Sequence, residues 1–377
     1  MPNEFLTTKN IARQTLPRLI ENLVFPNLVY RDFSNTFQKQ GDTIRVRKPV
    51  VLTAEEFDKS TGTSAQDVKE ESVDVTLNHL ATVDVEFGAL EMATNVDDLN
   101  RLFLEPAAVA LAQKINSDGL SLYKDVPYFG GVPGTTPDGL DDFAAITKLL
   151  NDNKVPMSQR RAIWDSAAHS KFIQIEGLVH LNESGTPTAL REAEIGRIYG
   201  LDNYMSQAVK THTQGTAISG NKTIAVAAAA VKGATSISVD SGAAAGTLKA
   251  GDIVKIGSYY YNVAADVEAI SATAASVSLV QPLKAAVADG DAITLVTYVS
   301  GKTGYTANLA FHQNAFAYVT RPLTVPAGVE CYVTNYNGIS LRVIRGYDMK
   351  YKKDMLSMDV LYGYKTMYPE MAVCYAG

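Results

Sequence analysis

The chain has 377 residues, which is long for one compact core and predicts two or more domains. Hydrophobic residues make up 46% and charged residues 20%, a balance that excludes wholesale disorder. The formal net charge of −6 argues against a dedicated nucleic-acid binder, and the lack of an 18-residue apolar run argues against a membrane-spanning protein. Cys331 and Cys374 are the only cysteines, which argues against a disulfide-rich or zinc fold. We expect both cysteines to be free thiols in a reducing cytoplasm.

Residues 1–40 have the character of an arm. Apolar residues recur with rough helical spacing from Ile11 to Leu23, and we expect Pro17 to interrupt this helix and Pro26 to end it. The first residues, MPNEFLTTKNIARQ, lack the apolar region of a signal peptide. Because exposed apolar side chains are costly in water, the arm is expected to lie on its own chain or on a neighbouring one.

Charge is unevenly distributed along the chain. Residues 1–50 contain 8 Lys and Arg against 4 Asp and Glu, whereas residues 51–150 contain 6 against 18. A basic arm is therefore followed by a strongly acidic segment. This asymmetry favours a protein that meets copies of itself, or an oppositely charged partner, through different patches.

Two segments that alternate in hydrophobicity, 41–50 and 72–88, are predicted to be strands. The residues between them, 53–71, are polar and acidic, which is typical of the tip of a long protruding hairpin. A lone hairpin is marginally stable in water, so we expect it to rest on another surface. Its acidic residues lack the spacing of a calcium loop.

The strongest helical pattern runs from Asn95 to Val126, and Pro106 is expected to divide it into a short and a long helix. After a loop rich in Gly and Pro, a second helix is predicted with Asp141 as its N-cap. The segment RRAIWDS then predicts a buried strand, followed by a short helix.

The composition changes between about Gly215 and Ser300. This stretch holds about 21 alanines and no Phe, Trp or His, and its short β-branched runs are separated by Gly-containing turns. The pattern predicts a small antiparallel barrel or sandwich inserted into the rest of the chain. After it, strands are predicted around NLAFHQNAFAYVTRPL, on both sides of a tight turn at Asn337-Gly338, and at the C-terminus.

No motif for catalysis or cofactor binding stands out. Gly301-Lys302-Thr303 resembles the end of a phosphate-binding loop, but Val296 occupies the position of its first glycine and no helix is expected after it. No two histidines have metal-site spacing, and no nucleophile elbow or dinucleotide fingerprint occurs. We therefore predict no catalytic residue, no cofactor and no metal. His312 is expected to pack in the core, or to face a symmetry axis beside copies of itself.

Five segments, in this order, resemble tailed-bacteriophage major capsid (coat) proteins. They are GDTIRVRKP, FLEPAAVALAQKINSDGLSLYKDV, IGRIYGLDNYMSQAVKTHT, ANLAFHQNAFAYVTRPL and LRVIRGYDMKYKKDMLSMDVLYGYK. The resemblance covers nearly the whole chain and is strongest to the subgroup that carries an inserted β-barrel domain. It implies an α+β chain with the HK97-like fold.

Mapped onto this chain, the resemblance implies six regions. They are an N-terminal arm at 1–40; the extended loop, spine helix and part of the peripheral domain at 41–134; the first part of the axial domain at 135–214; the inserted domain at 215–300; the axial-domain return and a hairpin at 301–345; and peripheral strands at 346–377. Some family members cross-link their subunits through a Lys and an Asn. Lys59 and Lys69 match that lysine only by their approximate position in the chain, so we do not assign this role to either residue.

The implied function is self-assembly into hexamers and pentamers of an icosahedral shell around double-stranded phage DNA. The implied partners are other copies of the chain, a scaffolding protein and a portal during assembly, and packaged DNA contacted without sequence specificity; no membrane is involved. Assembly would occur in the host bacterial cytoplasm, and the product is the virion capsid. Candidate inter-subunit contacts are Glu55, Glu56, Asp58, Glu70 and Glu71 in the loop and Arg13, Arg18 and Arg31 in the arm.

Two alternatives stay open on the sequence alone. An encapsulin-like shell has the same fold but encloses protein cargo. An oligomeric enzyme could assemble an active site from residues that are distant in the sequence.

Overall fold

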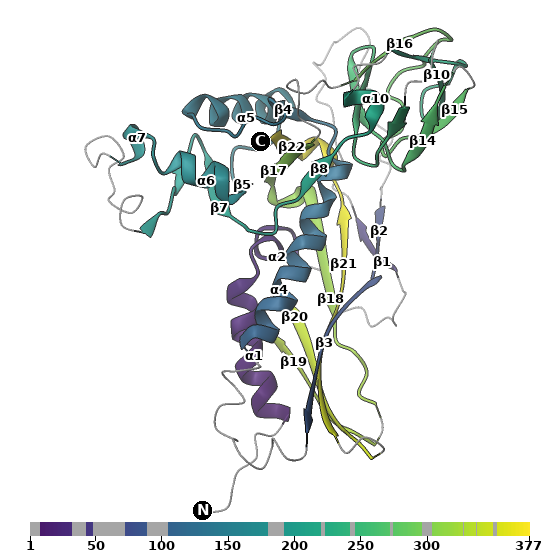
Figure 1. Cartoon of the computed structure of the whole chain (residues 1–377). Coiled ribbons are helices and arrows are strands. Elements are labelled where there is room, and N and C mark those ends of the chain that lie inside the picture. Colours follow the sequence, from purple (N-terminus) through teal and green to yellow (C-terminus); the bar gives the residue numbers. More distant parts are fainter. Residues whose placement is uncertain are drawn as a thin grey trace, which may run out of the picture. The chain divides into compact units, whose positions relative to one another are not determined.

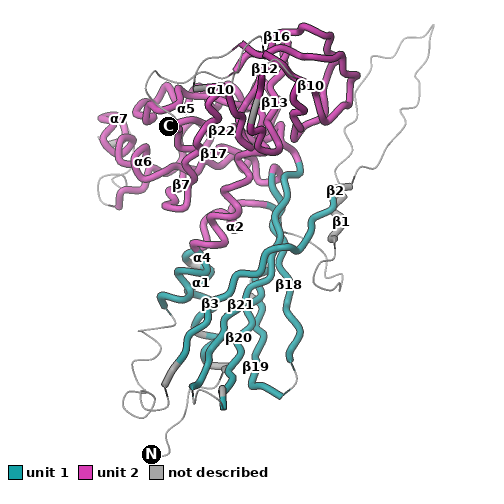
Figure 2. The backbone as a smooth tube through the Cα atoms, turned by 45° about the vertical axis from the view of Figure 1, so that its right-hand side comes forward, with its two compact units in different colours: residues 1–22, 30–112, 316–367 teal, residues 23–29, 113–315, 368–377 magenta. Residues whose placement is uncertain are grey.

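The computed structural model describes residues 8–31, 43–47, 72–88, 105–179, 192–219, 223–241, 246–271, 274–295, 304–326, 328–336, 338–349 and 353–377. The chain divides into two compact units (Figure 2). Unit 1 comprises residues 1–22, 30–112 and 316–367, and unit 2 comprises residues 23–29, 113–315 and 368–377. Among the described residues, no helix is both long and apolar enough to cross a membrane.

Unit 1 is built on a five-stranded antiparallel sheet. Its strands are β3 (His79–Gly88), β18 (Phe316–Arg321), β19 (Glu330–Tyr336), β20 (Ile339–Asp348) and β21 (Lys353–Thr366). The long strand β21 pairs with β3 along one edge and with β20 and then β18 along the other. One face of β20 and β21 is strongly apolar, and Leu341, Val343, Met358 and Val360 on it are fully buried.

Helix α1 (Thr8–Asn22) covers strands β19 and β20 in unit 1. The expected interruption at Pro17 is wrong, because the helix runs through this exposed proline. Its apolar side, which includes Ile11 and Leu19, is buried. Burial of that side against the sheet outweighs the one backbone hydrogen bond that proline removes. The helix ends at Asn22, before Pro26 in the first turn of α2 (Phe25–Leu28).

The predicted hairpin is confirmed at its base. Strands β1 (Thr43–Arg47) and β2 (Ser72–Thr76) pair antiparallel, with Thr43 opposite Thr76 and Arg47 opposite Ser72. The tip of the hairpin lies outside the described residues. After β2, the backbone passes so close to Gly363 of β21 that a Cβ there would lie 2.3 Å from the Thr76 carbonyl oxygen.

Helix α4 (Glu105–Leu120) is followed by a 3₁₀ turn, η2 (Ser121–Asp125). Pro106 lies in the first turn of α4, where a proline removes no intrahelical hydrogen bond. The predicted short helix before Pro106 falls on residues 89–104, outside the described part of the chain.

Unit 2 contains a seven-stranded mixed sheet in which β5 and β7 are parallel, as are β22 and β4. The strands are β4 (Phe129–Gly131), β5 (Arg160–Trp164), β6 (Arg197–Ile198), β7 (Leu201–Met205), β8 (Thr211–Thr213), β17 (Gly304–His312) and β22 (Ala372–Ala376). Short helices accompany the sheet: α5 (Leu140–Asp152), α6 (Ser166–Phe172), α7 (Glu176–Val179), η3 (Gln313–Ala315) and η4 (Pro369–Met371). Helix α5 packs beside β4 and β22 (Figure 1).

The predicted buried strand β5 and the short helix α6 are confirmed, and Trp164 of β5 packs edge-on against Phe143 and Phe172 in the core of this sheet. The predicted cap at Asp141 is wrong. Helix α5 begins at Leu140 with Gly139 as its N-cap, and the carboxylate of Asp142 accepts a hydrogen bond from the Gly139 backbone N–H at 3.1 Å.

Residues 216–295 of unit 2 form an antiparallel β structure with its own hydrophobic core, and we refer to these residues as the insert. It begins with α10 (Thr216–Ser219) and contains β9 (Ile224–Val226), β10 (Ser236–Asp240), β11 (Gly246–Leu248), β12 (Ile253–Ile256), β13 (Tyr259–Asn262), β14 (Val267–Ile270), β15 (Ala275–Ser278) and β16 (Ala292–Leu295). Its six-stranded sheet runs in the order β13-β12-β16-β9-β10-β15. A bridge between Val263 and Leu279 joins the two outer strands and closes the sheet into a barrel.

Candidate assembly sites

The described residues include only part of the set expected to mediate inter-subunit contacts. The loop acids Glu55, Glu56, Asp58, Glu70 and Glu71 lie outside the described residues. Arg13 is exposed on α1. Arg18 forms an ion pair with Glu105 of α4 at 2.9 Å, and Arg31 is half-buried. Arg18 therefore already has an acidic partner in its own chain, which the sequence pattern did not reveal.

An ion pair that sequence reasoning missed stabilises the sheet of unit 1. The Arg342 guanidinium donates to Asp359 Oδ2 from two nitrogens, at 2.5 and 3.0 Å, and to the Thr324 carbonyl oxygen at 3.1 Å. Ser357 donates to the other Asp359 oxygen at 3.0 Å. The side chain of Asp359 is 4% exposed, so these donors replace the water that the carboxylate loses. The pair links β20 and β21 to the segment after β18.

The insert is attached to the rest of unit 2 through a chain of three buried side chains. His212 of β8 lies between Tyr123 of η2 and Asp252 of the insert. Each ring nitrogen is 2.9 Å from its partner, Nδ1 from the Tyr123 hydroxyl and Nε2 from Asp252 Oδ1. Since a carboxylate only accepts hydrogen bonds, Nε2 carries a hydrogen, and Nδ1 of a neutral ring accepts from the tyrosine. Burial raises the pKa of Tyr123 above its ordinary value, which keeps its proton in place.

The other oxygen of Asp252 organises the backbone where the insert begins. Asp252 Oδ2 accepts from the Gly215 N–H at 3.1 Å and from the Lys249 N–H at 2.6 Å. Gly251 has a φ of +98°, and a Cβ there would lie 2.9 Å from the Lys124 side chain. A side chain at this position would therefore be strained and would push the insert away from η2.

A second polar connection lies beside the first. Gln281 of the insert donates to the Asp125 carbonyl oxygen at 2.7 Å and accepts from the Asn262 N–H at 3.0 Å. Lys284 of the insert lies 3.3 Å from the Tyr128 hydroxyl. Together with the buried chain through His212, these contacts attach the barrel to the rest of unit 2 at several points.

The Tyr123–His212–Asp252 arrangement superficially resembles catalytic machinery, but its environment does not suit catalysis. Tyr123, His212 and Asp252 are 4%, 3% and 1% exposed. A substrate cannot reach side chains that are this deeply buried. Cys374 lies in the same interior with a pKa raised to about 12 by burial, so its thiol stays protonated and is a poor nucleophile. We interpret the group as a structural polar connection.

His312 also has a structural environment. It is 4% exposed at the end of β17, opposite Arg160 of β5, and its Nδ1 accepts from the Asn314 N–H at 3.2 Å. Burial, and then the positive charges of Arg160 and Arg161, lower the pKa of His312. A neutral, buried ring fits the packing role expected from the sequence and is not available to face copies of itself.

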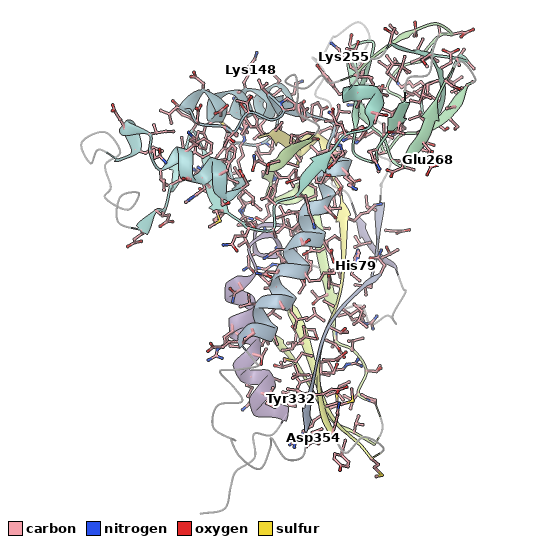
Figure 3. All side chains as sticks on the ribbon, viewed as in Figure 1. His79, Lys148, Lys255, Glu268, Tyr332 and Asp354 are labelled. Atoms are coloured by element: carbon pink, nitrogen blue, oxygen red, sulfur yellow. The ribbon has the colours of Figure 1, made fainter. Side chains whose placement is uncertain are left out.

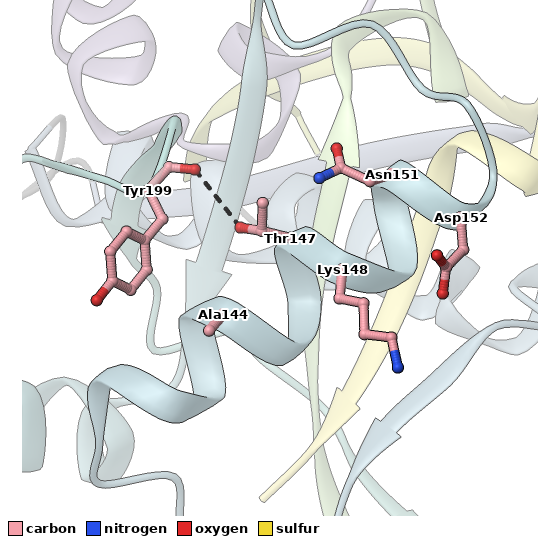
Figure 4. Close-up of a pocket in the computed structure, with 6 residues that line it drawn as sticks. All are labelled: Ala144, Thr147, Lys148, Asn151, Asp152 and Tyr199. Carbon is pink, nitrogen blue, oxygen red and sulfur yellow. Dashed lines mark hydrogen bonds between the residues drawn. The ribbon is translucent and has the colours of Figure 1, made fainter.

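A surface hollow of about 560 Å³ lies along the outer side of α5 (Figure 4). It is lined by Ala144, Thr147, Lys148, Asn151, Asp152 and Tyr199, and we call it the α5 hollow. Thr147 Oγ1 is 3.5 Å from the Tyr199 carbonyl oxygen, a weak hydrogen bond that joins α5 to the β6–β7 turn (Figure 4). Lys148 extends outward from α5 (Figure 3). Among the described residues, no group of His, Cys, Asp and Glu side chains could hold a metal ion.

Comparisons with known proteins place these features in context. The model of the family described as "P22 coat protein - gene protein 5" matches residues 262–377. A solved chain of Mycobacterium phage Che8 aligns over 94% of this chain and 90% of its own, with a TM-score of 0.53 and 16% identity. A chain of the capsid of Ralstonia phage GP4 aligns over 93% and 86%, with a TM-score of 0.48 and 9% identity. A chain from the capsid structure of the Cyanophage P-SCSP1u aligns over 93% of both chains, with a TM-score of 0.47 and 11% identity.

No curated protein matches the sequence. The coat-protein match covers the second half of the insert and the strands from β17 to β22, and the Che8 alignment covers nearly the whole chain. These findings confirm the predicted fold class, α+β and HK97-like with a barrel-like insert, and the chain shares its overall fold with the Che8 chain.

Proposed function

We propose that this chain is the major capsid protein of a tailed bacteriophage. The observation that carries the proposal is the coat-protein match over residues 262–377 within a chain whose fold aligns with a phage protein over 94% of its length. Its function is to assemble with copies of itself into the shell of the virion. The work of such a protein is geometric, since contacts between copies decide the size and closure of the shell.

In the more detailed form of the proposal, head-to-tail contacts between identical copies close into hexamers and pentamers, and these rings join into an icosahedral shell. A scaffolding protein and a portal take part in assembly in the host bacterial cytoplasm, and the mature shell encloses double-stranded DNA. The formal net charge of −6 argues against tight binding of DNA, because tight binding of phosphates requires an excess of basic groups, so the proposed contact with DNA is loose and independent of sequence.

The test is electron microscopy of the purified protein, expressed alone and together with the other structural genes of its source. We expect closed, uniform shells, and particles from the complete system should contain DNA of genome length. Shells that contain an enzyme as cargo would support the encapsulin-like alternative instead. Small oligomers with saturable turnover would support the enzyme alternative, and either result would overturn the proposal.

A further inference from the structure

We propose that residues 53–58 of one copy, the acidic start of segment 53–71, bind a patch of tyrosines and lysines on the insert of the next copy. We call this surface the tyrosine–lysine patch, and it consists of Lys255, Tyr259, Tyr260 and Lys284 of the insert together with Tyr128. The inference rests on the proposed function, since it requires that copies of the chain meet. It goes further by naming the two complementary surfaces and their charges.

Lys284 lies between two tyrosine rings. Its Nζ is 5.6 Å from the centre of the Tyr128 ring and 5.9 Å from the centre of the Tyr259 ring, and it lies 3.3 Å from the Tyr128 hydroxyl. The faces of both rings attract the ammonium group and hold it in place. Lys284 is exposed and forms no ion pair with a described residue. Its charge is therefore available to an acidic partner.

A second lysine and tyrosine lie on the same two strands. Lys255 of β12 is opposite Tyr260 of β13, and its Nζ is 5.5 Å from the centre of the tyrosine ring (Figure 3). Lys255 also forms no ion pair with a described residue. Tyr259 and Tyr260 are 42% and 40% exposed on β13, the last strand of its sheet. The patch therefore combines two positive charges with exposed aromatic area, and tyrosine is enriched where proteins meet.

The patch is ordered before any partner binds. The backbone N–H of Lys284 donates a hydrogen bond to the hydroxyl of Tyr261 at 3.0 Å, and Tyr261 is 1% exposed. This bond fixes the backbone of Lys284 beside β13, which carries Tyr259 and Tyr260. A surface ordered in advance loses little conformational entropy when it binds.

Segment 53–71 has the complementary composition. It contains six acidic residues and two lysines, and no separate stretch of 19 residues elsewhere in the chain has as many acidic residues. Phe57, its single aromatic residue, stands between Glu56 and Asp58 in the sequence EEFD. An aromatic side chain flanked by carboxylates matches a surface of tyrosine rings and ammonium groups, because the rings pack together while the opposite charges attract.

A second copy of the chain is the occupant that these observations favour. Arg47 and Ser72 are opposite each other at the base of the predicted hairpin, and 24 residues connect them. At about 3.3 Å a residue, half of that length reaches at most about 40 Å from the base, far enough to contact a neighbouring copy. The segment belongs to unit 1 and the patch to unit 2, so their contact between copies is head-to-tail. Such contacts repeat from copy to copy and close into rings when the rotation permits.

The test reverses the charges on each side, separately and together. The patch variant carries Lys255→Glu and Lys284→Glu, the segment variant carries Glu55→Lys, Glu56→Lys and Asp58→Lys, and the combined variant carries all five changes. The patch variant and the segment variant should each give roughly tenfold fewer shells by sedimentation, because like charges then face each other. The combined variant should recover most of the shell formation, since opposite charges are restored at every contact.

An equal mixture of the patch and segment variants separates a contact between copies from a contact within one copy. In the mixture, the altered segment of one copy can meet the altered patch of another, so shell formation should recover here as well. Recovery in the combined variant but not in the mixture would show that the segment binds its own chain, and it would overturn a second copy as the occupant.

Controls separate this contact from other effects. Lys148→Glu with Lys171→Glu is a matched change, since both lysines are exposed in unit 2, lie outside the patch and form no ion pair with a described residue, and it should assemble normally. Phe57→Ser should reduce shell yield, and Phe57→Tyr should retain it. Normal shells from the patch variant, or no recovery in a combined variant that is folded by circular dichroism, would overturn the contact. Neither result would affect the proposed function, which fails only if the unaltered protein forms no shells.

Discussion

At the scale of single residues, the buried polar groups of unit 2 each have a defined structural task. Asp252 receives hydrogen bonds from His212 and from the backbone N–H groups of Gly215 and Lys249. Its carboxylate is the shared acceptor at the base of the insert. Such a group is valuable because removing it leaves several donors without partners at once.

We predict that Asp252→Ala lowers the free energy of unfolding of unit 2 by about 3 kcal/mol, because three donors lose their buried acceptor. Trp164 is the only tryptophan and lies in unit 2, so its fluorescence during urea unfolding reports this loss. Asp266→Ala is a matched control. Asp266 also accepts a backbone bond, but it is 57% exposed, and its loss should cost about 1 kcal/mol or less. Equal losses in the two variants would contradict the assigned role.

His312 leads to a prediction about pH. Its pKa is lowered in the folded protein, so the unfolded chain binds the extra proton more readily, and stability falls as pH drops below the unperturbed value of about 6.5. The His312→Gln variant lacks this contribution. Its midpoint of urea unfolding should change less between pH 7.5 and pH 5.5 than that of the original protein. The same pH dependence in both proteins would show that protonation of His312 does not affect stability.

At the scale of elements, tertiary packing overrides local preference in α1. The helix continues through Pro17 because its apolar side is buried and it packs against β19 and β20. The proline lies on the exposed side. The element therefore tolerates a local defect that would break a helix in isolation.

We predict that Pro17→Ala stabilises α1 by about 1–3 kcal/mol, because alanine restores a backbone donor to the Arg13 carbonyl and relieves the clash of the ring with it. Hydrogen exchange of the backbone amides in α1 measures the effect and should become slower. Arg13→Ala, a change at another exposed position of the same helix, should leave exchange nearly unchanged. Unaltered exchange in the Pro17→Ala variant would mean that α1 accommodates the proline without cost.

At the scale of the whole molecule, function depends on how copies meet, and the acidic segment 53–71, which the sequence predicts to be the tip of a hairpin, is a candidate contact. We predict that changing Glu55, Glu56 and Asp58 together to Lys impairs assembly at low and moderate salt. Residues 51–150 carry 18 acidic and 6 basic residues, whereas residues 1–50 carry 4 acidic and 8 basic residues, so the change would weaken an attraction between the acidic segment of one copy and a basic surface of another, such as the basic arm or the tyrosine–lysine patch. Shell yield by sedimentation should recover partly near 1 M salt, where charges are screened within about 3 Å. Normal yield from this variant at low salt would contradict an ionic role for the loop.

Local sequence patterns identify some features of this protein and miss others. The hairpin base, the buried strand β5 and the barrel were predictable, because alternation and turn residues are properties of neighbouring positions. The bonds from His212 to Asp252 and from Arg342 to Asp359 were not predictable, since each joins residues that only the folded chain brings together. The cap of α5 was missed, because more than one residue near Asp141 suits a helix start and only the backbone geometry selects between them.

The sequence by itself determined the α+β class, the inserted β domain and the likeness to tailed-phage capsid proteins, because these depend on periodicity, composition and the order of segments along the chain. The tertiary structure alone decided which polar groups attach the insert, how Arg160 bonds to the backbone between α5 and β5, and where the α5 hollow lies. The physical reason is that hydrogen bonds, ion pairs and hollows require atoms to lie within a few ångströms of one another. Distance along the chain does not specify that closeness.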